Sequence, residues 1–172
     1  GSKFQEKFLE GFLQKPYRIR PTGTVYLNYI KSGENIDKIE EPPLCASKLT
    51  SGEAKEVAKY LMSLKDPKMP AGVYTPGAKF SKPMAKVSFF KSTACNACHQ
   101  VELNGEIKGG VSAPALYDAG SRLNGDWVMS FLKDPRYWEP KGWAPSLNLS
   151  DRSRELLTNF VMSMKKEGGD HE

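Results

Sequence analysis

The sequence predicts an all-α fold, and three observations support this prediction. Apolar residues recur at helical spacing in the segments that follow Ser51 and Asp151. Residues that can cap a helix, Thr50 and Ser150, stand directly before these two segments. Stretches rich in proline and glycine separate the helical segments, and such stretches end helices and interrupt central strands. We therefore expect short helices joined by irregular loops.

The helical segments form a repeat. Three pairs of segments match in the same order along the chain: 12–16 with 131–135, 49–51 with 149–151, and 60–65 with 160–165. The repeated unit is a helix, a proline stop, a loop and a capped helix, and the loop of the first copy (23–43) is the longer one. Two helical hairpins that share common capping and stop residues by chance are the alternative explanation.

The repeat divides the chain into two units and a linker. Residues 1–65 form the first unit, and residues 84–172 form the second. Residues 66–83 between them carry four prolines and two glycines, so they are predicted to form neither a helix nor a central strand. We expect this linker to lie against the surface of one unit or both.

The second unit contains a motif with specific chemistry. A helix predicted over 85–94 leads into Cys95-Asn96-Ala97-Cys98-His99, which is the signature of covalent c-type haem attachment. Each thiol can add to one vinyl group of a porphyrin, and the histidine then becomes the proximal ligand of the iron. The sequence therefore predicts one covalent haem c, held by Cys95, Cys98 and His99. The first unit has no such motif and is predicted to lack haem.

Two other uses of the motif are disfavoured. Zinc would need further Cys or His ligands at matching spacing, and the chain offers only Cys45 and His171. A thioredoxin-like redox pair would need a strand before it and a βαβ pattern, whereas we expect helix on both sides. Cys45 is most simply interpreted as a small buried apolar residue.

The second unit resembles the class I cytochrome c family, in particular bacterial single-haem domains. Besides the haem motif, the resemblance rests on the order of Ala113-Pro-Ala-Leu116, Gly120-Ser-Arg-Leu123, Trp127, Phe131-Leu-Lys-Asp-Pro135 and Pro145-Ser-Leu-Asn-Leu-Ser150. It implies a class I cytochrome c fold for the second unit, preceded by a haem-less partial repeat. It also implies that the carbonyl of Pro114 receives a hydrogen bond from His99 and that Arg122 meets a haem propionate. Trp127 and Trp143 are then expected to contact the cofactor.

The sequence departs from the family at the sixth iron ligand. The family usually supplies methionine, followed by proline, from the loop before the last helix, and this chain has Ala144-Pro145 there. Met69, on the linker and also followed by proline, is our first candidate for the ligand. Met84, a bound water and a vacant position remain open as alternatives, as do His171, a tyrosine or a lysine.

These expectations imply a one-electron carrier and not an enzyme. The alternative is a haem protein with an open distal face that binds small ligands, as a gas sensor or a weak peroxidase. Scattered lysines give a net charge of +5, which suits an acidic redox partner and does not form a nucleic-acid stripe. That partner is expected to be a protein, and a larger respiratory or multihaem complex is one setting.

The expected location is periplasmic or otherwise extracytoplasmic, because bacterial haem attachment occurs outside the cytoplasm. The opening Gly1-Ser2 has the form of a tag remnant, and we expect a targeting or anchoring segment, such as a membrane anchor, in the native protein. The last helix is expected to run to about Lys166, followed by a disordered tail.

Overall fold

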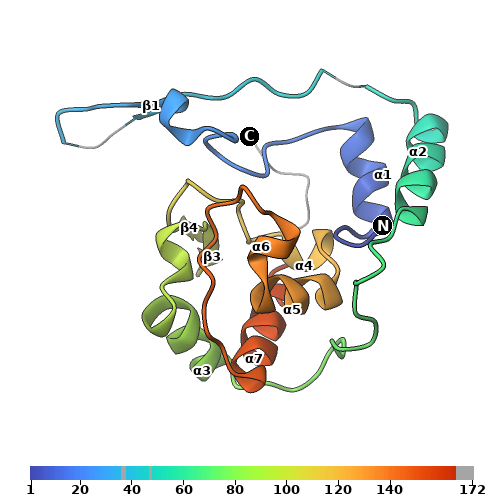
Figure 1. Cartoon of the computed structure of the whole chain (residues 1–172). Coiled ribbons are helices and arrows are strands. Elements are labelled where there is room, and N and C mark those ends of the chain that lie inside the picture. The colour runs from blue at the N-terminus through green and yellow to red at the C-terminus, as the bar shows by residue number, and fades with distance from the viewer. Residues whose placement is uncertain (36–37, 47, 166–172) are drawn as a thin grey trace.

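The computed structural model describes residues 1–35, 38–46 and 48–165, so the predicted tail and His171 lie outside the described residues. The last helix ends at Met162, earlier than the predicted end near Lys166. The described residues form seven α-helices and two small two-stranded antiparallel sheets (Figure 1). The prediction of a helical protein is therefore right in the main, but the chain is not purely helical. None of the described helices combines the length and the apolar character needed to cross a membrane.

The α-helices are α1 (Glu6–Gln14), α2 (Ser51–Ser63), α3 (Lys82–Val87), α4 (Ala119–Arg122), α5 (Gly125–Lys133), α6 (Pro135–Trp138) and α7 (Asp151–Met162). The strands are β1 (Ile30–Lys31), β2 (Lys38–Ile39), β3 (Val101–Leu103) and β4 (Glu106–Lys108). Short 3₁₀ turns occur at Tyr26–Tyr29 and Cys95–Ala97, and a π-helical turn at Ser88–Ser92 continues α3.

The predicted helix starts are confirmed. The Thr50 hydroxyl accepts a hydrogen bond from the amide of Glu53, and the Glu53 carboxylate accepts one from the amide of Thr50, which makes a reciprocal capping box at α2. At α7, the Ser150 hydroxyl accepts from the amide of Ser153. Each cap satisfies backbone groups that the first helical turn leaves unpaired.

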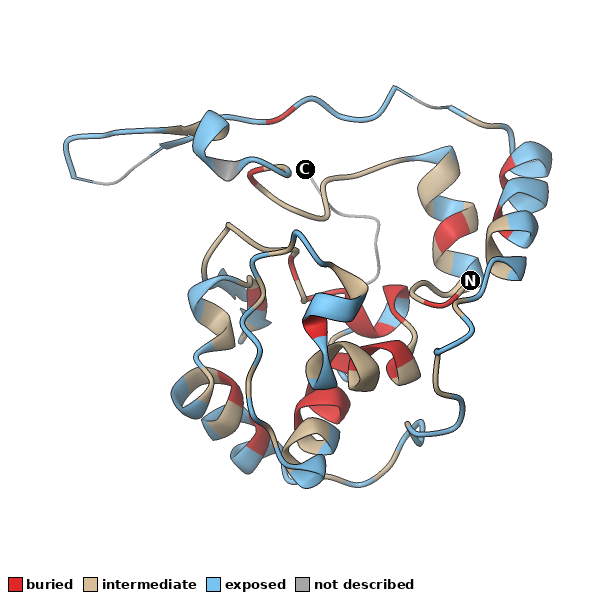
Figure 2. Ribbon diagram, viewed as in Figure 1, coloured by how far each residue is buried: buried red, intermediate tan, exposed pale blue. Residues whose placement is uncertain are grey.

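The main core lies in the second unit, where α3, its π-helical extension, α5 and α7 meet. Figure 2 shows buried residues gathered on α4, α5 and α7. Phe89 is fully buried, and its ring centroid lies 5.3 Å from that of Phe160 in an edge-to-face contact. Val87, at the end of α3, is 57% exposed. The π-helical turn that follows it changes the angular spacing of the side chains, so Phe89 takes the core position.

The two copies of the repeat have matching structures. Helix α1 corresponds to α5, and α2 corresponds to α7. Within each unit the two helices lie side by side, α1 with α2 and α5 with α7 (Figure 1). The match extends back to Gly1 and Gly120. A Cβ atom on either glycine would lie 2.1 Å from a backbone oxygen, that of Met62 for Gly1 and that of Met162 for Gly120. Both glycines therefore permit the same close approach to the second helix of their unit.

Ser2 belongs to the fold. Its side chain is buried, and its hydroxyl accepts a hydrogen bond of 2.8 Å from the amide of Asp66. The Gly1 amino group donates to the carbonyl of Leu61 at 2.6 Å. These contacts fasten the start of α1 to the end of α2.

The two units join through a short antiparallel bridge between Phe4 and Leu123. Backbone hydrogen bonds of 2.9 Å flank the bridge, from Gln5 to Arg122 and from Asn124 to Lys3. Under the repeat, Gln5 is equivalent to Asn124 and Lys3 to Arg122. Each unit thus makes the same contact with the other, which is the pattern of a local two-fold axis.

The linker contains no helix or strand between Leu64 and Ser81, and it is fixed to α5. The Asp126 carboxylate, in the first turn of α5, accepts from the amides of Gly72 at 2.9 Å and Tyr74 at 2.7 Å. Gly125 makes room for the Tyr74 ring, because a Cβ atom there would lie 2.0 Å from it. The linker therefore follows the surface of the second unit.

The structure after His99 differs from the prediction. We expected helix on both sides of the haem motif, but the chain turns into the β3–β4 hairpin. Asn104 and Gly105 at its tip both have positive φ, at 54° and 80°. An Asn-Gly pair favours this kind of tight hairpin turn, so the signal was present in the sequence. Similarly, the short helix α6 occupies the start of the segment that leads to the last helix.

Candidate functional site

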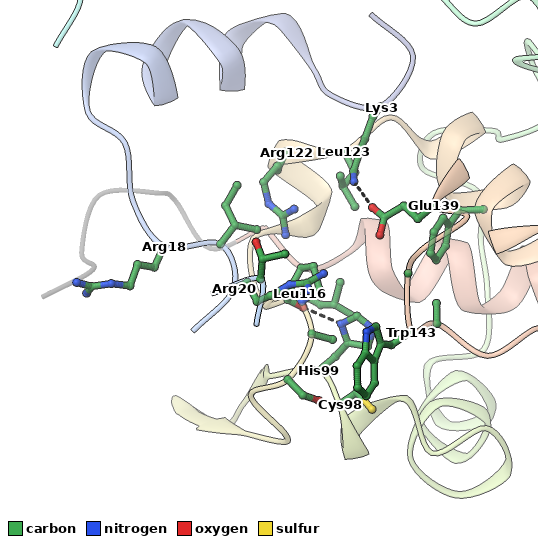
Figure 3. Close-up of a pocket in the computed structure, with 18 of the residues that line it drawn as sticks. Lys3, Arg18, Arg20, Cys98, His99, Leu116, Arg122, Leu123, Glu139 and Trp143 are labelled. Carbon is green, nitrogen blue, oxygen red and sulfur yellow. Dashed lines mark hydrogen bonds and ion pairs between the residues drawn. The ribbon is translucent and has the colours of Figure 1, made fainter. Parts of the chain in front are cut away.

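A cavity of about 1220 Å³ lies between the two units and contains the predicted haem-attachment residues. Cys95, Cys98 and His99 line it, and so do the other residues predicted from the sequence to contact the cofactor: Pro114, Arg122, Trp127 and Trp143. Figure 3 shows Cys98, His99, Arg122 and Trp143 in this cavity. Cys98 is exposed and Trp143 is 78% exposed, so the cavity opens to solvent along that edge.

The motif forms a tight turn that places its reactive side chains on one wall. Ala94 has a positive φ of 49°, which bends the chain out of the preceding helical segment. The 3₁₀ turn Cys95–Ala97 follows, and the amide of His99 donates to the carbonyl of Cys95 at 3.0 Å. One turn of chain therefore carries both thiols and the imidazole to the same cavity.

The glycine-rich segment after the hairpin supports this turn from behind. The amide of Gly110 donates to the carbonyl of Asn96 at 2.8 Å, and the amide of Ala113 donates to that of Cys98 at 3.0 Å. A Cβ atom on Gly110 would lie 2.0 Å from the Ala97 oxygen. Only glycine permits this approach, so Gly110 fixes the position of the motif.

The His99 imidazole is held in one orientation. Its Nδ1 atom lies 2.7 Å from the carbonyl oxygen of Pro114, as the family resemblance implied. A carbonyl only accepts hydrogen bonds, so Nδ1 carries the proton and Nε2 keeps its lone pair. Burial lowers the pKa of His99, and the positive charges of Arg20 and Arg122 lower it further, against the opposing effect of the Pro114 hydrogen bond. A neutral imidazole with a fixed tautomer is the form that binds a metal.

The two motif cysteines are free thiols in the structure. Burial raises the pKa of Cys95 and outweighs the opposing effect of its hydrogen bond with Thr93, whose hydroxyl lies 3.1 Å from the sulfur. Reactive redox cysteines have a lowered pKa, so this environment is not typical of a thioredoxin-like pair.

Arg122 is buried and its charge is balanced within the protein. Its guanidinium lies 3.1 Å from the Asp118 carboxylate, in an ion pair whose side chains are 3% and 4% exposed, and donates to the carbonyl of Ala115. Tyr17 of the first unit donates its hydroxyl proton to the same Asp118. Arg122 lines the cavity as predicted, but this network already provides its counter-charge. A propionate contact for Arg122 stays a prediction.

Trp127 lies on α5, and its ring stacks on Phe131 at 4.9 Å between centroids. The Lys3 ammonium lies 4.7 Å from the centroid of the Trp127 ring and 2.9 Å from the Glu139 carboxylate. These contacts bring together the first unit, α5 and the segment after α6 on one wall of the cavity.

The sequence did not predict that the first unit would line this cavity. The contribution comes mostly from the chain that follows α1, and includes Tyr17, Arg18, Arg20, Pro43 and Cys45. Cys45 is exposed, in contrast to the expected buried position, because the 40–46 segment crosses the surface in extended form. A repeat identifies similar elements but not the faces on which they pack, so no sequence signal could have located this wall.

Met69 is not among the described residues that line the cavity. Met69 packs against the main core from the linker, and the cavity walls contain no methionine within the described residues. Met84 lies on α3 and is 54% exposed. Met69 as the sixth ligand therefore stays a prediction.

The chemistry of these residues fits a haem group. The cavity is large enough for a porphyrin, since ordinary ligand pockets occupy about 300–1,000 Å³. Two free thiols at one edge can form thioether bonds, and Nε2 of His99 is available to the iron. In the described part of the chain, no group of three or more His, Cys, Asp or Glu side chains is arranged to hold a bare metal ion.

Comparisons with protein-family models, with curated proteins and with solved structures found no match for this chain.

Proposed function

We propose that this protein is a c-type cytochrome domain that transfers single electrons through one covalent haem in a class I cytochrome c fold. The observation that carries the proposal is the geometry of His99. A neutral imidazole, oriented by the Pro114 carbonyl at 2.7 Å, stands beside two free thiols at the edge of a cavity of porphyrin size. Haem supplies reversible one-electron redox chemistry when it is bound.

The residues of the chain have three roles in this proposal. Cys95 and Cys98 would hold the porphyrin, and His99 would bind the iron with the basicity that the Pro114 hydrogen bond gives it. The stacked Trp127 and Phe131 rings keep water from one wall. Exposed Cys98 marks the edge at which a redox partner would approach, and the net charge of +5 favours an acidic partner. Haem attachment places the protein outside the cytoplasm.

Spectroscopy of protein that has been exported with haem-attachment machinery tests the function. The expected result is a low-spin c-type spectrum that titrates reversibly as a single one-electron couple. A His99→Ala variant should keep the covalent haem and lose the low-spin spectrum. A protein that binds haem but does not cycle between two redox states would contradict the electron-transfer role.

A second candidate is a haem protein with an open distal face that binds small ligands. It is supported by one observation: among the described residues that line the cavity there is no methionine, and no histidine other than His99. Carbon monoxide separates the two functions, because a vacant iron position binds it readily. A Met69→Ala variant, with Met84→Ala as its control, should change the spectrum only if Met69 is the ligand.

A further inference from the structure

Two arginines of the first unit line the cavity, and they differ in their surroundings. Arg18 points away from His99 in Figure 3, donates to the carbonyl of Pro42 at 2.8 Å and pairs with Glu41 at 3.1 Å. Arg20 extends beside Leu116 toward His99 in the same view. Its position close to His99 agrees with its contribution to the lowered pKa of that imidazole.

Arg20 has no counter-charge within the described part of the chain. Its guanidinium makes no ion pair and no hydrogen bond there, although its side chain is partly buried. By contrast, Arg122, which lines the same cavity, is balanced by Asp118. A partly buried cation is stabilised by an anion that it can bind, and a planar guanidinium is well shaped for a carboxylate.

The backbone holds Arg20 at the wall. The carbonyl of the preceding residue, Ile19, accepts a hydrogen bond of 2.7 Å from the amide of Ala115. The hydroxyl of Thr22, two residues further on, is buried and donates to the carbonyl of Val111 at 2.9 Å. The residues on both sides of Arg20 are therefore hydrogen-bonded to the segment that carries Pro114, the residue that orients the His99 imidazole.

We propose that Arg20, from the haem-less first unit, binds a propionate carboxylate of the haem. This inference rests on the proposed function, since haem is the group that brings carboxylates into the cavity. The first unit is then part of the cofactor site, and its role is to keep one propionate ionised through a charge-assisted hydrogen bond. Arg122, which the family resemblance favoured, keeps its place in the Asp118 network.

The reduction potential and its dependence on pH test this proposal. Loss of a nearby cation stabilises the ferric state, so Arg20→Gln should lower the potential at alkaline pH. The propionate should then have a pKa raised by about 1–3 units. Its protonation should make the potential of the variant depend on pH between about 5 and 8, where the wild type is nearly flat. Arg20→Lys, which keeps the charge, should restore most of the wild-type behaviour.

Arg18→Gln is the matched control, because Arg18 lines the same cavity but is paired with Glu41. The other charged or titratable groups on the cavity walls are Lys3, Tyr17, Cys45, Cys95, Cys98, His99, Arg122, Glu139 and Lys141. They are unchanged in both variants, so the difference between the variants isolates Arg20.

Three outcomes would overturn the inference: an unchanged potential in Arg20→Gln, an unchanged pH dependence, or equal effects of Arg18→Gln and Arg20→Gln. If Arg20→Gln does not accumulate with haem, Arg20→Lys decides, and a potential identical to that of the wild type would count against the proposal. Wild-type protein that never acquires haem would instead refute the proposed function itself, so the two failures are distinguishable.

Discussion

Phe4 and Leu123 pair as an antiparallel bridge, although they occupy equivalent positions in two different units. The flanking hydrogen bonds are reciprocal, so the two units contact each other through equivalent residues. The chain that follows α1 lines the cavity together with His99. The haem-less unit is therefore joined directly to the candidate site.

The Gln5 side chain is predicted to stabilise this junction. Its Nε2 donates to the carbonyls of Gly120 at 3.0 Å and Leu123 at 2.6 Å. Gln5→Ala leaves both carbonyls without this donor, so we expect a loss of about 1–3 kcal/mol in the free energy of unfolding. Urea denaturation measures it. Gln14→Ala is the control, because the Gln14 amide bonds only to its own helix at an exposed position, and we expect less than about 0.5 kcal/mol there. Equal losses in the two variants would contradict the prediction.

Gly110 is predicted to be essential for the shape of the haem motif. The Cβ atom of Gly110→Ala would lie 2.0 Å from the Ala97 oxygen, so the turn must move. We expect a loss of about 1–3 kcal/mol and a smaller fraction of protein with attached haem. Thermal unfolding and the haem absorbance per polypeptide measure both effects.

Gly11 provides the matched control for Gly110. It lies inside α1 with nothing within 4 Å of a new Cβ atom. Gly11→Ala should raise the free energy of unfolding by about 0.5–1 kcal/mol and leave haem attachment unchanged. Destabilisation by Gly11→Ala would contradict the open space around Gly11. Wild-type stability in Gly110→Ala would contradict the close contact between Gly110 and the Ala97 oxygen.

Tyr17 is predicted to make stability depend on pH in the alkaline range. Burial, followed by the hydrogen bond to Asp118, raises the pKa of Tyr17 well above 10.0. The unfolded chain therefore releases this proton first. The contribution of Tyr17 to stability is complete below about pH 10 and is lost as the pH rises above it. Tyr17→Phe should show a shallower decline in the free energy of unfolding above pH 10. Parallel declines in the two proteins would refute this coupling.

Much of the fold could be predicted because its signals are local. Thr50 and Ser150 cap helices as expected, and the prolines and glycines of 66–83 exclude helix and strand. The β3–β4 hairpin also had a local signal, the Asn104-Gly105 pair at its tip. The prediction of a helix after the haem motif did not take this pair into account.

Some residues of the candidate site could be predicted from local sequence, and others could not. Cys95, Cys98, His99 and Pro114 lie together as the motif and the family resemblance implied. Arg20 and Cys45 could not be placed at the cavity, because only the packing of the two units brings their segments there. Met69 was proposed from the proline that follows it. It is not among the described residues that line the cavity, and its role as a ligand stays a prediction.

Intact mass measurement of the exported protein tests the central claim most directly. We expect the polypeptide mass plus that of one haem, and a Cys95→Ala, Cys98→Ala double variant should show the polypeptide mass alone. A wild-type protein that is folded and exported together with the attachment machinery, but carries no added haem mass, would contradict this account.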